Sequence, residues 1–213
     1  MDFLPEALQE YCEEHTSHES DVLYHLNRHT HLNVLRPRML SGHLQGQFLT
    51  FLVRMARATS ILEIGTYTGY SAIAMAQGME REGEIITIDC NEEIHRTAID
   101  HINKAGYGNQ IEMIIGNALE LIPTIRKTFD FVFIDADKEN YLNYYKLVID
   151  QVESGGYILA DNVLWSGKVV EAVKEGDVET EAILSFNQYV QQDERVENIL
   201  LPLRDGLMLI YKK

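Results

Sequence analysis

Short apolar runs alternate with longer amphipathic stretches from Ser60 onward, and this alternation constrains the fold more than any other feature of the chain. The apolar runs lie at 61–64, 85–89, 111–115, 129–135, 157–161, 196–201 and 207–211. Helix-like stretches separate the first six, at 70–79, 92–105, 118–122, 140–152 and 179–192. This order is typical of a mostly parallel sheet with helices on both faces. Only a short link joins the last two runs, so we expect them to pair antiparallel as a hairpin.

The first 58 residues have no strong strand pattern and predict helices at 5–14, 20–30 and 42–58. A chain of 213 residues is long enough for one α/β domain with a full core, whereas two large domains would be crowded. We therefore predict a single domain over 1–213. It consists of a helical N-terminal extension at 1–58 and an α/β core at 59–213 that contains the seven-stranded sheet.

Acidic residues outnumber basic ones, with 33 Asp and Glu against 18 Lys and Arg and a net charge of −15. Such a surface would repel nucleic acid and anionic membranes, so we expect neither as a partner. The two cysteines, Cys12 and Cys90, are far apart and form no metal-binding or redox motif. The N-terminus is acidic and lacks an apolar signal segment. These features predict a cytoplasmic protein.

The first strand-to-helix turn carries Gly65 and Gly69, and Asp89 ends the next apolar run. Glycines at such a turn let the backbone approach a ligand, and an acidic residue about 20 positions later binds ribose hydroxyls in nucleotide-binding folds. The full dinucleotide pattern is not met, because Tyr67 occupies the middle glycine position. We predict a nucleoside-type ligand; the alternative is that both glycines serve packing alone.

Glu63 lies in the same buried strand and needs a partner, because an unpaired buried carboxylate is costly. A ligand's amino group or amide donors would supply one. The alternative is a salt bridge to a neighbouring Arg or Lys.

Oxygen-bearing side chains follow two more strands: Asp135 after the fourth, and Asp161 and Asn162 after the fifth. The carboxyl ends of parallel strands meet at one crevice, so these three should converge. Oxygen donors without Cys or His favour a hard cation such as Mg²⁺. The alternative is that each Asp caps the following helix. Lys138 at the same edge is either a general base or a solvated lysine, and Trp165 either walls a flat aromatic substrate or packs its loop.

These residues together resemble the cation-dependent S-adenosylmethionine O-methyltransferases, the group that includes catechol and caffeoyl-CoA O-methyltransferases. The resemblance rests on the stretches 62–71, 133–138 and 161–165. It implies a Rossmann-like class I methyltransferase fold, S-adenosylmethionine as cofactor, and a homodimer. It also implies a divalent cation, with Mg²⁺ favoured and Mn²⁺ or Ca²⁺ as alternatives.

The resemblance further implies roles for single residues. Glu63, Gly65, Thr66 and Ser71 match contacts to the cofactor's methionine side, Asp89 the ribose ligand, and Ala118 a residue near the adenine. Met39 and Ser41 match backbone contacts to the cofactor, and Asp137 and Asp135 match further cofactor contacts. Asp135, Asp161 and Asn162 match the metal triad, and Lys138 matches the base, with Asp135 beside it in catalysis.

The expected function is methyl transfer to a hydroxyl of a small catechol-like aromatic acceptor carrying two adjacent hydroxyls. A divalent cation that chelates both hydroxyls would lower their proton affinity. Two alternatives use the same architecture: a nicotinamide-dependent oxidoreductase, disfavoured by Tyr67, and a non-catalytic cofactor-binding interaction module.

Overall fold

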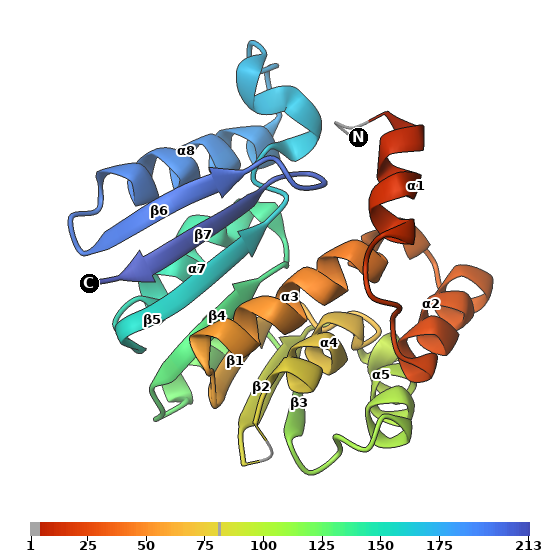
Figure 1. Cartoon of the computed structure of the whole chain (residues 1–213). Coiled ribbons are helices and arrows are strands. Elements are labelled where there is room, and N and C mark those ends of the chain that lie inside the picture. The colour runs from red at the N-terminus through yellow and green to blue at the C-terminus, as the bar shows by residue number, and fades with distance from the viewer. Residues whose placement is uncertain (1–4, 81) are drawn as a thin grey trace.

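The computed structural model describes residues 5–80 and 82–213, so Met1–Leu4 of the predicted N-terminal extension lie outside the described residues. Helices and strands follow one another as the alternating pattern predicts (Figure 1). The α-helices are α1 (Glu6–Glu14), α2 (Asp21–Asn33), α3 (Gly42–Ala56), α4 (Tyr70–Gly78), α5 (Glu92–Lys104), α6 (Ala118–Leu121), α7 (Tyr141–Val148) and α8 (Val178–Gln192). The 3₁₀ turns are η1 (Pro37–Met39), η2 (Ile122–Thr124), η3 (Lys138–Asn140) and η4 (Trp165–Val170). The strands are β1 (Ser60–Ile64), β2 (Glu84–Asp89), β3 (Ile111–Ile115), β4 (Phe129–Ile134), β5 (Val152–Asp161), β6 (Val196–Leu201) and β7 (Leu207–Lys212).

The seven strands form one sheet in the order β3-β2-β1-β4-β5-β7-β6. Strands β1 to β5 are parallel, β7 pairs antiparallel with β5, and β6 pairs antiparallel with β7. The predictions of a mostly parallel sheet and of a C-terminal hairpin are both confirmed. Chain order reverses at β1 and β4, which opens a crevice at their carboxyl ends where ligands bind in such sheets.

Both faces of the sheet are covered by helices, because its central strands are apolar on both sides. On one face, Tyr145 of α7 and Phe186 of α8 pack against residues such as Val132 of β4. On the other face, Leu49 of α3 and Ile73 of α4 belong to the second core (Figure 1). The sheet thereby holds the ends of β1, β4 and β5 in fixed register.

The link between α1 and α2 is fastened to the rest of the chain by side chains of α3 and α4. His43 and Gln47 bond the carbonyls of Ser17 and His18, and the Tyr70 hydroxyl donates to Glu19 at 2.6 Å. Among the described residues, no helix is both long and apolar enough to cross a membrane.

The predicted boundary between the helix at 140–152 and the following strand is wrong. The helix expected at 140–152 ends at Val148, and Val152 already pairs with Phe129 at the start of β4. The register then shifts between Phe129 and Phe131, so β5 takes in Gly155 and Gly156 before the apolar run. Sheet pairing therefore overrides the helical spacing of the apolar residues in this stretch.

Candidate active site

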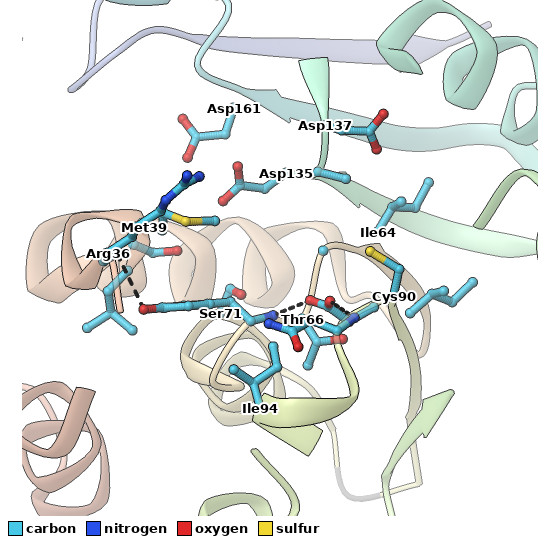
Figure 2. A pocket seen from close by; sticks show the side chains of 18 of the residues that line it. Arg36, Met39, Ile64, Thr66, Ser71, Cys90, Ile94, Asp135, Asp137 and Asp161 are labelled. Atoms are coloured by element: carbon cyan, nitrogen blue, oxygen red, sulfur yellow. Dashed lines mark hydrogen bonds between the residues drawn. The ribbon is translucent and has the colours of Figure 1, made fainter. Parts of the chain in front are cut away.

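A cavity of about 1370 Å³ opens at the carboxyl ends of β1, β2, β4 and β5. All but one of the predicted site residues line it, and Figure 2 shows several of them converging on one space. The lining residues among them are Met39, Ser41, Gly65, Thr66, Ser71, Asp89, Ala118, Asp135, Asp137, Lys138, Asp161 and Asn162. Glu63 is the exception, because it is fully buried behind the wall.

Gly65 allows β1 and β4 to approach closely where they end. Its φ of 104° is unfavourable for other residues, and a Cβ there would overlap the Asp135 carbonyl oxygen. The Asp135 amide donates to the Ile64 carbonyl at 2.8 Å, which joins the two strand ends. Gly65 thus serves packing, and that packing also forms the cavity wall.

Asp89 holds the glycine turn in place from the end of β2. Its Oδ2 accepts from the Tyr67 amide at 2.7 Å, and its Oδ1 accepts from the Asn91 amide at 2.9 Å. A carboxylate fixed in this way presents its remaining lone pairs to the cavity that it lines.

The alternative that Glu63 forms a salt bridge with a neighbouring Arg or Lys is wrong, because none of the ion pairs among the described residues includes Glu63. Its Oε2 accepts from the Thr87 hydroxyl, and its Oε1 has no hydrogen-bond partner among the described residues. Burial raises the pKa of Glu63 to about 8, although the nearby hydroxyls of Ser71 and Thr87 oppose the shift. Glu63 Oε1 can therefore still accept a hydrogen bond, and Ser71 of the cavity lining lies near it.

Asp135 and Asp161 lie side by side in Figure 2 and extend their carboxylates into the same part of the cavity. Asp161 is only 3% exposed, and burial together with the charge of Asp135 raises its pKa to about 6. Neither residue caps a helix: α7 begins after Asn140, and η4 begins after Leu164. The helix-cap alternative is thus wrong for both.

Asn162 follows Asp161 in a left-handed conformation with φ of 57°. Its amide N–H donates to Asp161 Oδ1 at 2.6 Å, whereas its side chain makes no hydrogen bond with any other described residue. A non-glycine residue in this conformation is uncommon, and Asn adopts it more readily than most other residues. The Asn162 side chain is therefore free to bind a group in the cavity.

Lys138 is 7% exposed, so the solvated-lysine alternative is wrong. Its ammonium donates to Asp135 Oδ1 at 3.2 Å and to the Tyr141 hydroxyl at 2.6 Å. Tyr141 in turn donates to the Asp161 carbonyl at 2.9 Å. The Trp165 ring centroid lies 6.0 Å from Lys138 Nζ. Trp165 packs against the core and also lines the cavity, so both of its predicted roles fit the structure.

Asp137 lies on the far side of Asp135 and points away from the Asp135–Asp161 pair (Figure 2). It accepts hydrogen bonds from the Asn140 amide and the Tyr144 hydroxyl. Asp137 also lines the cavity.

Three polar residues that contact the candidate site were missed from the sequence. Tyr141 bridges Lys138 and Asp161, Gln45 donates to Asp161 Oδ2 at 2.6 Å, and Arg204 donates to Gln45. A polar Gln between apolar residues of the predicted third helix was a usable signal. Arg204 gave none, because an Arg in a short link is ordinary.

Among residues 5–80 and 82–213, no three His, Cys, Asp or Glu side chains are grouped so that they could hold a metal ion by themselves. A cation at this site would therefore depend on the amide oxygen of Asn162 as well as on the two carboxylates.

Comparison with known proteins identifies the family. The profile of the O-methyltransferase family matches residues 13–213. A caffeoyl-CoA O-methyltransferase of Petroselinum crispum is 38% identical over 176 residues, which cover 78% of this chain and 73% of that protein.

Two solved structures are similar over nearly the whole chain. The SAH-bound methyltransferase PaMTH1 of Podospora anserina is 28% identical, with a TM-score of 0.90 over 100% of this chain and 99% of that one. The Bacillus cereus O-methyltransferase in complex with SAH is also 28% identical, with a TM-score of 0.90 over 97% of each chain. The fold is that of the class I methyltransferases, as predicted, and the chain belongs to the O-methyltransferase family of S-adenosylmethionine-dependent enzymes.

Proposed function

We propose that this enzyme transfers a methyl group from S-adenosylmethionine to one hydroxyl of a small catechol-like acceptor, with a divalent cation held by Asp135, Asp161 and Asn162. The observation that carries the proposal is that the neighbouring carboxylates of Asp135 and Asp161 and the free side chain of Asn162 line one cavity. Two like charges this close favour a cation between them, and the donor set is all oxygen, which suits Mg²⁺ and leaves Mn²⁺ or Ca²⁺ as alternatives. Membership in an enzyme family leaves no support for the oxidoreductase and non-catalytic alternatives.

The cofactor would occupy the part of the cavity formed by the glycine turn and the end of β2. Asp89 suits ribose hydroxyls, and the unpartnered oxygen of Glu63 together with Ser71 suits the donors of the methionine moiety. Met39, Ser41, Gly65, Thr66, Ala118, Asp135 and Asp137 line the same cavity and complete the proposed contacts. The SAH in the similar structures supports this assignment.

The bound cation would supply a lower proton affinity and a fixed orientation for the acceptor hydroxyls. Lys138 would take the proton that the hydroxyl loses as its oxygen bonds the methyl carbon and the carbon–sulfur bond breaks. Hydrogen bonds from Lys138 Nζ to Asp135 Oδ1 at 3.2 Å and to the Tyr141 hydroxyl at 2.6 Å hold this nitrogen beside the proposed cation ligands.

The test is Asp161→Ala, assayed on a panel of catechols and matching monophenols with and without a chelator. We expect more than about a 100-fold loss of catechol methylation, with SAH binding by calorimetry nearly unchanged, because Asp161 serves the cation and not the cofactor. Asp150→Ala is the control, since that side chain is 81% exposed at the surface. Full turnover by Asp161→Ala in the presence of chelator would overturn the proposal.

We also propose a single domain, a homodimer and a cytoplasmic location. The family resemblance supports the first two. The free cysteines Cys12 and Cys90 support a reducing compartment.

A further inference from the structure

A buried relay of side chains links the Asp161 carboxylate to the turn between β6 and β7. Asp161 Oδ2 accepts from Gln45 Nε2 at 2.6 Å, and Gln45 Oε1 accepts from Arg204 Nη1 at 2.9 Å. Gln45 is fully buried in α3, and Arg204 is half-buried in the turn. The three residues come from distant parts of the sequence and meet at the cavity wall.

The direction of the Gln45 amide is fixed by the charges at its two ends. A guanidinium has only donors, so it can face only the amide oxygen. The amide NH₂ must then face the carboxylate, which has only acceptors when ionised. The relay therefore holds the Asp161 carboxylate in one orientation at the cavity wall.

Arg204 also binds the segment that carries the proposed cofactor contacts Met39 and Ser41. Its Nη1 donates to the Ser41 carbonyl, and its Nη2 donates to the Leu40 carbonyl at 3.2 Å. One guanidinium thus touches the backbone at the cofactor side of the cavity and, through Gln45, the carboxylate at the cation side.

We propose that Gln45 and Arg204 are positioning residues that preset Asp161 for cation binding, and that Arg204 couples this site to the cofactor-binding segment. The inference rests on the proposed cation role of Asp161. Partners that orient a metal ligand from outside the coordination sphere typically change metal affinity by about 10- to 100-fold when removed.

The experiment measures Mn²⁺ binding by electron paramagnetic resonance on the full chain without acceptor. Gln45→Met keeps the volume but removes both hydrogen bonds, and we expect Mn²⁺ affinity to fall at least about tenfold. Arg204→Gln should weaken Mn²⁺ and SAH binding together, whereas Gln45→Met should leave SAH affinity within about twofold, because only Arg204 touches the cofactor segment. Arg204→Lys should recover part of the loss, since one ammonium can still reach some of the acceptors.

Gln47→Met, two residues along the same helix, and Arg126→Gln, an exposed arginine, are the controls and should bind both ligands as the wild type does. The double variant Gln45→Met/Arg204→Gln should lose no more Mn²⁺ affinity than the worse single variant, because the two residues act in series. If Gln45→Met does not fold, as a melting curve would show, Arg204→Gln carries the test.

Two results would overturn the inference and are distinguishable. If Mn²⁺ affinity falls in Asp161→Ala but is unchanged in Gln45→Met and Arg204→Gln, the relay does not position the ligand. If Asp161→Ala binds Mn²⁺ as the wild type does, the proposed function itself fails, and the inference fails with it.

Discussion

Glu63 shows at the scale of a single residue how burial makes a carboxyl group dependent on its ligand. Its pKa in the folded protein is about 8, whereas the ordinary value is 4.5. Between pH 4.5 and pH 8 the folded state therefore holds a proton that the unfolded chain has released. Without ligand, stability must therefore fall as pH rises through that window and level off above about pH 8. Glu63→Gln removes the titration, and we expect the variant to lack this decline, which is on the order of 5 kcal/mol over the whole window.

Urea denaturation at several pH values between 5 and 9 tests this prediction. Glu112→Gln, an exposed change in β3, should keep the wild-type pH dependence. A Glu63→Gln profile that parallels the wild type would show that Glu63 is ionised in the folded state at neutral pH.

Functional residues could be predicted from the sequence where a charged side chain stands in or directly after an apolar strand. Glu63 in an apolar strand and Asp161 directly after another were recognisable because buried charge is costly without a partner. Gln45 and Arg204 could not be paired with Asp161 in advance, because the sequence does not say which distant side chains will meet. Their partnership depends on how α3 crosses the ends of the strands.

At the scale of elements, the junction of β1 and β4 depends on Gly65. Gly65→Ala would force β1 and β4 apart at Asp135, because a Cβ has no room beside its carbonyl oxygen. We expect the free energy of unfolding to fall by more than about 2 kcal/mol and SAH affinity to fall more than about tenfold. Gly106→Ala is the matched control: its φ is 82°, but nothing lies within 4 Å of a Cβ there. Equal losses in the two variants would mean that backbone strain alone, and not strand separation, accounts for the effect.

Element type and order were predictable because the apolar runs change period where the structure changes. The boundary between α7 and β5 was not, because Leu147, Val148 and Val152 keep helical spacing across it. Pairing of Val152 with Phe129 decides that boundary, and this partner lies more than twenty residues earlier in the chain. Local pattern thus predicts an element well, but a non-local pair sets where it begins.

At the scale of the whole molecule, the net charge of −15 creates a repulsion that any added salt will screen. Both NaCl and MgCl₂ should therefore raise the free energy of unfolding. At equal ionic strength the two salts screen charge alike, so they should change the free energy of unfolding by different amounts only if Mg²⁺ binds a specific site. This difference separates a general acidic surface from the cation site proposed at Asp135, Asp161 and Asn162.

We expect MgCl₂ to stabilise the wild type more than NaCl at equal ionic strength. The extra free energy of unfolding should reach about 2–3 kcal/mol when free Mg²⁺ exceeds its dissociation constant about 100-fold, since only the folded chain brings the two carboxylates together. Asp161→Ala should lose this extra stabilisation but keep the part that NaCl also produces. Chemical denaturation in the two salts measures both parts. An equal Mg²⁺ advantage in Asp161→Ala would assign the effect to carboxylates spread over the surface, because the variant still carries nearly all of the negative charge.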